Sequence, residues 1–181
     1  TVVSVLEELA PDIPVVVDPV MIAKGGHALL ADEAQDALKS RLLPTATLIT
    51  PNIPEAEVLS GMKISGVDDM AGVAEAILAM GPKAVLVKGG HLENTETVCD
   101  ILVTSDSDWA FEAMRIDTPN THGTGCTLAS AIACGIAQAM ELPDAVARAQ
   151  AYVIEAIRTN PGYGTGHGPL NHAHTVSDFK V

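Results

Sequence analysis

The stretch from Asn120 to Thr127 carries the residues best suited to chemistry. It reads Asn-Thr-His-Gly-Thr-Gly-Cys-Thr, a polar, glycine-rich turn, and an apolar stretch rich in small residues follows it. The first N–H groups of a helix have no acceptor within the helix, and the helix dipole adds partial positive charge there. Because Gly123 and Gly125 have no Cβ, an anion can approach the backbone closely. The pattern predicts that Gly123, Thr124 and Gly125 bind an oxyanion at the start of a helix.

Cys126 is predicted to lie on the first turn of this helix and to point at the same place. A helix N-terminus favours the thiolate over the thiol, so Cys126 is a candidate base or nucleophile. The alternative interpretation is a tight turn with a cysteine that acts only as a small hydrophobic residue. The stretch is not a P-loop, since no Lys-Ser/Thr pair follows the glycines, and it lacks the spacing of the dinucleotide fingerprint.

Polar residues also follow three short apolar runs, at 13–17, 47–50 and 84–87. Runs of this kind, bounded by turn signals, are typical of strands buried on both faces. Asp18 follows the first run and Lys88 the third. Open α/β sheets bind ligands at the carboxyl ends of their strands, so both are candidates for contacts with phosphate or its metal ion. The alternatives are an ordinary turn aspartate and a solvated loop lysine.

Asn52 and Glu55 follow the second run. Their spacing is that of a helix cap, in which the two side chains bond each other's backbone. The functional interpretation is that they hold nucleotide phosphates or the waters of Mg²⁺. Capping by itself explains the pattern more simply, and both interpretations stay open at this point.

The remaining periodicity predicts how these residues are positioned. Apolar spacing indicates helices over 31–43, 68–80, 126–140 and 143–159, and residues 51–55 open a further helix that Asn52 can cap. Strands at 98–104 and 109–116 are expected to form an edge hairpin. This order predicts an α/β fold with a mainly parallel sheet. Cys134 is interpreted as a core residue, and the tail at 162–174, rich in Gly and His, as polar surface. Residues 1–9 resemble a helix whose beginning is absent.

Composition narrows the function classes. A chain of 181 residues is long enough for one domain, expected over 1–181. The formal charge of −13 argues against nucleic acid or an anionic membrane as a partner. No apolar run reaches the roughly 18 residues of a membrane span. The three cysteines show no CxxC spacing, which favours a reducing cytoplasm over a disulfide frame or a zinc site.

Five motifs stand in the order of a known family: Asp18-Pro19-Val20-Met21, Ile49-Thr50-Pro51-Asn52-Ile53-Pro54-Glu55-Ala56, Leu86-Val87-Lys88-Gly89-Gly90-His91, the glycine turn 120–127, and Gly166-His167-Gly168-Pro169-Leu170-Asn171-His172. The chain resembles the hydroxymethylpyrimidine/phosphomethylpyrimidine kinases of thiamin biosynthesis, in the ribokinase-like superfamily. The cysteine in the glycine turn distinguishes this family from most ribokinase relatives, which carry an aspartate there.

The resemblance implies a ribokinase-like fold and transfer of the ATP γ-phosphoryl group to a small pyrimidine alcohol and then to its monophosphate. It implies Cys126 as the base and residues 123–125 as the anion hole. Asp18, Asn52 and Glu55 then belong to the Mg²⁺ and phosphate region, with Asp18 and Glu55 as metal ligands, and Lys88 to the nucleotide region. It further implies a homodimer.

Three departures separate this chain from the family pattern. Gln150 replaces a lysine of the last helix, Gly25 and His27 replace the common Ser and Asp of the loop after Lys24, and the family's N-terminal portion is missing from the sequence. Two alternatives therefore stay open beside the pyrimidine kinase. One is a pyridoxal or pyridoxine kinase, and the other is a truncated, inactive nucleotide-binding module.

Overall fold

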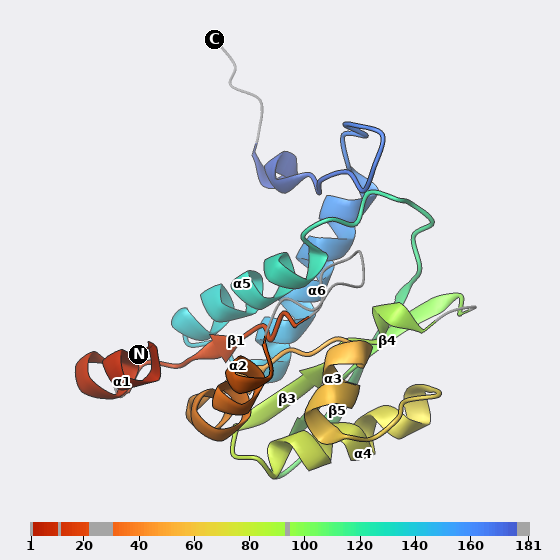
Figure 1. Cartoon of the computed structure of the whole chain (residues 1–181). Coiled ribbons are helices and arrows are strands. Elements are labelled where there is room, and N and C mark those ends of the chain that lie inside the picture. Colours follow the sequence, from red (N-terminus) through yellow and green to blue (C-terminus); the bar gives the residue numbers. More distant parts are fainter. Residues whose placement is uncertain (1, 11, 22–30, 93–94, 177–181) are drawn as a thin grey trace. The chain divides into compact units, whose positions relative to one another are not determined.

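The computed structural model describes residues 2–10, 12–21, 31–92 and 95–176. They form two compact units, residues 1–114 and 115–181, and each unit is described by itself (Figure 1). The expectation of a single domain over 1–181 stays a prediction. The loop at 24–27, with the family departures at Gly25 and His27, lies outside the described residues.

The first unit is built on a five-stranded sheet in the order β1-β2-β3-β4-β5. Its strands are β1 (Val16–Val17), β2 (Leu48–Ile49), β3 (Ala84–Val87), β4 (Thr97–Thr104) and β5 (Asp108–Met114). β1 pairs parallel with β2, and β2 with β3. This confirms the α/β fold and the parallel strands, although β1 and β2 are shorter than the apolar runs that predicted them.

The last two strands form the expected antiparallel hairpin at the edge of the sheet. β4 runs antiparallel to both β3 and β5. Along β5 the side chains alternate between exposed and half-buried, with Trp109 and Phe111 on the half-buried side. This is the pattern of a strand with one face to solvent. All four residues of β3 are buried, as the continuous apolar run predicts.

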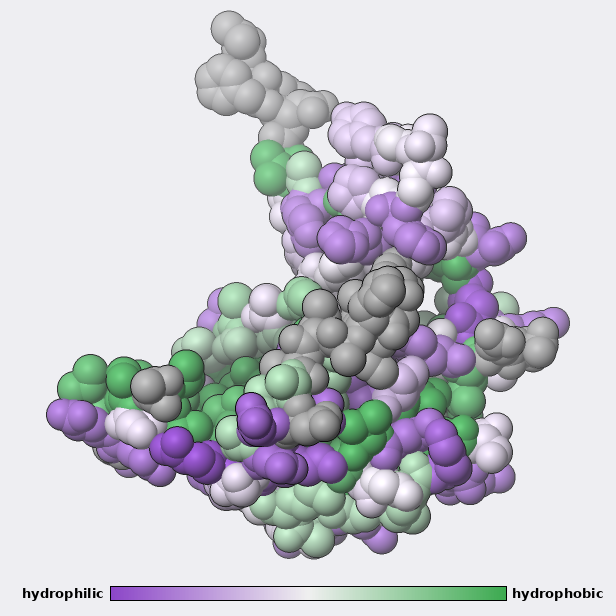
Figure 2. Space-filling view, viewed as in Figure 1, coloured by the Kyte–Doolittle hydropathy of each residue, from purple (hydrophilic) through white to green (hydrophobic). Residues whose placement is uncertain are grey.

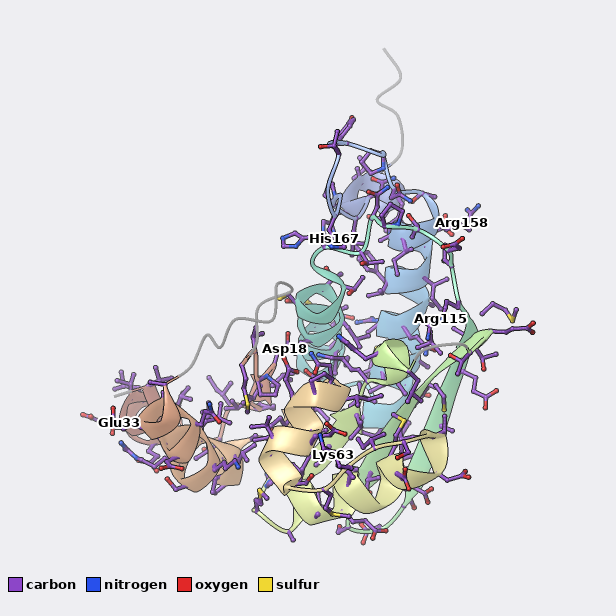
Figure 3. The ribbon with its side chains drawn as sticks, turned by 45° about the vertical axis from the view of Figure 1, so that its right-hand side comes forward. Asp18, Glu33, Lys63, Arg115, Arg158 and His167 are labelled. Carbon is purple, nitrogen blue, oxygen red and sulfur yellow. The ribbon has the colours of Figure 1, made fainter. Side chains whose placement is uncertain are left out.

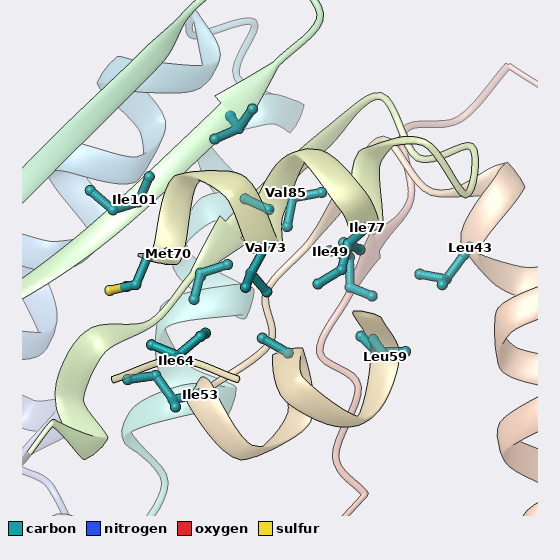
Figure 4. Close-up of a cluster of buried hydrophobic side chains, with 14 of the residues drawn as sticks. Leu43, Ile49, Ile53, Leu59, Ile64, Met70, Val73, Ile77, Val85 and Ile101 are labelled. Atoms are coloured by element: carbon teal, nitrogen blue, oxygen red, sulfur yellow. The ribbon is translucent and has the colours of Figure 1, made fainter. Parts of the chain in front are cut away.

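Two helices cover one face of this sheet. α4 (Val67–Leu78) packs on β3 and β4, and α3 (Ile53–Ser60) packs beside α4. Their apolar sides meet the sheet in one buried cluster (Figure 4), whose members include Ile49, Leu59, Met70, Val73, Ile77, Val85 and Ile101. The apolar spacing that predicts a helix over 68–80 thus becomes the core that holds the strand ends in place.

The other helices of this unit differ in detail from their predictions. α1 (Val2–Leu9) confirms the helical spacing of the first residues, and it exposes an apolar strip of Val2, Val5 and Leu9 (Figure 2). The helix predicted over 31–43 is α-helical only in α2 (Asp32–Ala37). It continues as a π-helix, η1 (Leu38–Leu42), and a 3₁₀ turn, η2 (Leu43–Thr45), because Pro44 has no N–H for a regular helical bond.

The second unit is a helix pair with a structured tail. α5 (Thr124–Ala137) packs on α6 (Leu142–Arg158), and the short 3₁₀ helix η4 (His172–Thr175) follows. A Cβ at Gly135 would lie 2.7 Å from the Cβ of Ala145, so the missing side chain allows the close approach of the two helices. As expected, α6 carries Glu155 and Arg158 on its outer side, where they form an ion pair of 2.6 Å.

The prediction that Cys134 is a core residue is wrong, because Cys134 is exposed. The buried side of α5 is formed by Leu128, Ala129, Ile132 and Gly135. Cys134 follows Cys126 by eight residues, so the two cysteines lie on the same side of the helix. This side is exposed and faces away from the buried residues. None of the helices in the described parts of the chain is long and apolar enough to cross a membrane.

Candidate functional site

In the first unit, three strand ends bring together side chains that are far apart in the sequence. Lys88, which follows β3, donates from Nζ to Oδ1 of Asp18, which follows β1, over 2.7 Å. Their side chains are only 14% and 15% exposed. Because β1, β2 and β3 are parallel, their carboxyl ends meet at the same edge of the sheet. The Lys88 side chain is thus largely buried and ion-paired, and it is not a solvated loop lysine.

Thr50, at the end of β2, is a site residue that the sequence interpretation did not single out. It is fully buried, and its hydroxyl donates to the same Asp18 oxygen over 3.1 Å. Oδ1 of Asp18 therefore accepts two hydrogen bonds, whereas Oδ2 takes part in none among the described residues. The sequence does carry a signal for Thr50, because it is a polar residue at the end of an apolar run, just before Pro51.

Asn52 and Glu55 form a complete capping box at the start of α3. Oδ1 of Asn52 accepts from the Glu55 N–H over 2.9 Å, and Oε2 of Glu55 accepts from the Asn52 N–H over 2.8 Å. The capping interpretation is confirmed. It does not remove the functional one, because the same residues also lie at the end of β2, beside the Asp18–Lys88 pair.

Glu55 combines burial with neighbouring charges. It is 2% exposed, and this burial raises its pKa, partly offset by the backbone N–H of Asn52 and the charge of Lys88, while Asp18 raises it further. The electrostatic influence of Lys88 and Asp18 on Glu55 places the three ionisable groups in one cluster. Figure 3 shows Asp18 on the side of the unit that carries α3.

The carboxylates of this cluster fit a Mg²⁺ ion whose other ligands are phosphate and water oxygens. No group of three His, Cys, Asp or Glu side chains in the described segments is arranged to hold a metal. Mg²⁺ in nucleotide sites is held by one or two carboxylates, with phosphate and water oxygens as the other ligands. Asp18 and Glu55 supply two carboxylates, and within the described part of the chain Oδ2 of Asp18 accepts no hydrogen bond.

A second buried carboxylate lies behind Lys88. Oδ1 of Asp100, on β4, accepts from the N–H of Gly89 over 2.9 Å, in the 3₁₀ turn η3 (Gly89–His91). Asp100 is 7% exposed. The sequence interpretation missed it, although an aspartate inside an apolar strand is a recognisable signal, since a buried charge needs a partner.

In the second unit, the glycine turn leads into α5 as predicted. Gly123 is the N-cap residue and has a φ of 88°, a left-handed conformation that favours glycine. No side chain caps α5, so the N–H groups of Thr124, Gly125 and Cys126 have no acceptor within the helix. Cys126 lies on the first turn and is exposed. This is the arrangement that an anion-binding turn requires.

The glycine turn is held by the tail. Asn120 donates from Nδ2 to Oδ1 of Asn160 over 2.6 Å, and its own Oδ1 accepts from the Gly168 N–H over 3.0 Å. His122 N–H donates to the Gly168 carbonyl over 3.2 Å. A Cβ at Gly168 would collide with Oδ1 of Asn120. Gly168 and Pro169, which open the Gly-Pro-Leu-Asn-His motif, therefore lie against the turn, so the tail is more than polar surface.

A shallow pocket of about 630 Å³ runs along the open side of α5. Its lining includes Cys126, Ser130 and Cys134 from α5 and Tyr152 from α6. The rings of His172 and His174 lie against Tyr152, at centroid distances of 6.4 and 4.5 Å.

The predicted site residues thus assemble into two groups. Asp18, Asn52, Glu55 and Lys88 lie together in the first unit. Gly123, Thr124, Gly125 and Cys126 lie together in the second unit. Each group has the local geometry that its sequence pattern predicts, and the assignment of both groups to one catalytic site stays a prediction.

Comparison with known proteins identifies the family. The family described as phosphomethylpyrimidine kinase matches residues 1–171. The chain is 49% identical over 166 residues to the thiamine biosynthesis bifunctional protein ThiED of Geobacter sulfurreducens, covering 92% of this chain and 34% of that protein. Further relatives, 41–47% identical, are named hydroxymethylpyrimidine/phosphomethylpyrimidine kinase. The chain spans 34–65% of the length of the curated relatives that it matches.

Similar solved structures support the same family assignment. A phosphomethylpyrimidine kinase from Clostridium difficile is 44% identical, with a TM-score of 0.74 over 86% of this chain and 62% of that one. An ADP complex of a Bacillus subtilis pyridoxal kinase is 34% identical, with a TM-score of 0.83 over 95% of this chain and 63% of that one. The fold is ribokinase-like, and the chain belongs to the phosphomethylpyrimidine kinase family.

Proposed function

We propose that this chain transfers the γ-phosphoryl group of ATP to the primary hydroxyl of hydroxymethylpyrimidine, and then to the resulting monophosphate. The observation that carries the proposal is the cluster of Asp18, Glu55 and Lys88 at three neighbouring strand ends. Phosphoryl transfer depends mainly on positioning and on neutralising phosphate charge. Two carboxylates and an ammonium group, all shielded from water, supply the charges for that task.

The cluster is assigned to the nucleotide phosphates and their magnesium ion. Asp18 and Glu55 would hold Mg²⁺, with Asn52 as a further polar contact, and bound Mg²⁺ supplies a Lewis acid that neutralises phosphate charge. Lys88 meets a phosphate oxygen as a point charge. Thr50 keeps the Asp18 carboxylate oriented through its hydrogen bond.

The glycine turn of the second unit is assigned to the transferred group. Its backbone N–H groups, from Thr124 to Cys126, donate to the equatorial oxygens of the γ-phosphoryl group. The acceptor hydroxyl oxygen bonds to phosphorus, the bond from phosphorus to the bridging oxygen of ADP breaks, and the hydroxyl proton passes to the Cys126 thiolate. ADP and the phosphorylated pyrimidine leave.

The base assignment is tested with matched cysteine variants. We incubate wild type, Cys126→Ala and Cys134→Ala with Mg-ATP and hydroxymethylpyrimidine, and measure mono- and diphosphate products by mass spectrometry. Cys134 is the control, because it is exposed on the same side of the same helix, eight residues further on. Cys126→Ala is expected to lose most turnover and keep ATP binding, and Cys134→Ala to keep both. Equal turnover of both variants would remove the base role from Cys126.

A second candidate is a pyridoxal kinase, favoured by the TM-score of 0.83 with the Bacillus subtilis enzyme. The same assay, with pyridoxal as the acceptor, separates the two. Phosphorylation of pyridoxal but of neither pyrimidine would reject the main proposal. ATP binding without product from any acceptor would favour the inactive nucleotide-binding module.

We further propose a homodimer that works in the cytoplasm. The three cysteines are free, which suits a reducing compartment. Sedimentation equilibrium tests the dimer directly, since a single species at the monomer mass of 18.7 kDa would reject it.

A further inference from the structure

We infer that Asp100 is a positioning residue that aims the Lys88 ammonium group at the Asp18 cluster. Asp100 lies on β4. It acts on the amide that directly follows Lys88. The functional part of this inference, nucleotide binding through Lys88, rests on the function proposed above.

Hydrogen bonds hold the two peptide groups that flank Lys88. The Lys88 N–H donates to the Pro51 carbonyl over 2.9 Å, and the Gly89 N–H donates to Oδ1 of Asp100 over 2.9 Å. Lys88 itself has an extended backbone, with φ −86° and ψ 116°. Because both neighbouring amides are held, both backbone dihedrals of Lys88 are fixed. The starting direction of its side chain is fixed with them.

The packing of Gly89 adds a second constraint. A Cβ at Gly89 would collide with the carbonyl oxygen of Cys99, the residue before Asp100. The turn after Lys88 is therefore pressed directly onto the backbone of β4. A close backbone contact and a buried carboxylate bond then hold the same residue from neighbouring positions of one strand.

The chemistry of the acceptor explains why an acid occupies this position. A carboxylate accepts a stronger hydrogen bond from an N–H group than a neutral acceptor does. Asp100 is 7% exposed, so its removal leaves the Gly89 N–H buried without that acceptor, a situation that proteins avoid. The turn would move to find another partner, and Lys88 would move with it.

The test compares Asp100→Asn, which keeps an oxygen acceptor, with Asp100→Ala, which does not. Val103→Ala is the matched control, because Val103 is a buried residue of the same strand, 4% exposed, at the end away from the turn. The first readout needs no ligand. Each background is combined with Lys88→Met, and urea unfolding is followed by the fluorescence of Trp109.

If Asp100 aims Lys88, Lys88→Met raises the unfolding equilibrium constant less in the Asp100→Ala background than in wild type. The expected difference is at least about twofold, the lower end for residues in one hydrogen-bond network. Val103→Ala leaves the effect of Lys88→Met unchanged, and Asp100→Asn, whose neutral oxygen accepts a weaker hydrogen bond, reduces that effect less than Asp100→Ala does. An equal effect of Lys88→Met in all backgrounds overturns the inference, whatever the protein binds.

The second readout is the binding of Mg-ATP by calorimetry. Asp100→Ala is expected to weaken binding roughly tenfold, as for loss of a hydrogen bond to a charged group, and Lys88→Met in that background to add little. Val103→Ala binds as wild type does. Coupling in the first readout with no ATP binding by wild type rejects the proposed function and leaves the link between Asp100 and Lys88 standing. Additive losses in ATP binding overturn the positioning role.

Discussion

Asn52 is the residue at which capping and catalysis can be separated by experiment. Asn52→Ala removes the acceptor of the Glu55 N–H, a bond of 2.9 Å. Loss of such a cap costs about 1 kcal/mol, within a range of roughly 0.5–2. α3 is only eight residues long and contributes Ile53 and Leu59 to the core. We therefore expect a loss of about 1–2 kcal/mol, equivalent to roughly 2–8 °C in Tm for a chain of this size.

Asn52→Ser is the matched variant, because serine caps about as well as asparagine and lacks the amide. We expect it to lose only a few tenths of a kcal/mol. Stability is measured by urea unfolding with Trp109 fluorescence. Trp109 is the only tryptophan of the chain, and it lies on β5 in the same unit as α3. Equal losses for the Ser and Ala variants would refute the capping argument.

The same pair of variants then tests the functional interpretation of Asn52. If the amide contacts nucleotide phosphates, Asn52→Ser keeps its stability and its KM for Mg-ATP rises. If Asn52 is only a cap, the KM of Asn52→Ser equals that of wild type. The two roles thus predict different outcomes for a variant that folds equally well in both cases.

Three further predictions follow from single residues. Glu55→Gln keeps an acceptor for the cap. Burial raises the pKa of Glu55 above its ordinary value of 4.5, so above pH 4.5 the native state holds a proton that the unfolded state has lost. The stability of wild type relative to Glu55→Gln is therefore expected to fall as the pH rises above 4.5. Urea midpoints between about pH 4.5 and 7 measure this difference. Gly89→Ala places a Cβ against the Cys99 carbonyl and is expected to lower the free energy of unfolding by at least about 2 kcal/mol. Gly90→Ala, whose Cβ has nothing within 4 Å, is expected to change it by less than about 1 kcal/mol. Similar urea midpoints for the two variants would contradict this. Gly72→Ala, inside α4 and also with nothing within 4 Å, is expected to gain about 0.5–1 kcal/mol, and a lower Tm would refute it.

Local signals gave the most reliable predictions. The capping box of Asn52 and Glu55 involves residues three apart, and its geometry is complete in the structure. The glycine turn before α5 is equally local, and Gly123 adopts the left-handed conformation that the pattern requires. The continuous apolar run at 84–87 became β3 with its bounds unchanged. In each case the sequence neighbours themselves supply the interactions that fix the structure.

Predictions failed where partners come from distant elements. Thr50 and Asp100 gain their roles from Asp18 and Gly89, which lie 32 and 11 residues away. The prediction that Cys134 is a core residue failed on α5, an apolar helix rich in small residues. An evenly apolar helix has no periodicity to show which side is buried, and the contact of Gly135 with Ala145 on α6 decides it.

The Asp18–Lys88 pair shows how a site can be predicted without its geometry. Both residues were candidates because each follows an apolar strand, and that argument does not need to know which strands are neighbours. Their contact over 70 residues needs β2 to lie between β1 and β3, and both pairings to be parallel. A largely buried ion pair gains little net stability, because desolvation of the charges offsets their attraction. Its placement at the strand ends where α/β folds bind ligands is therefore better explained by a charged ligand than by stability.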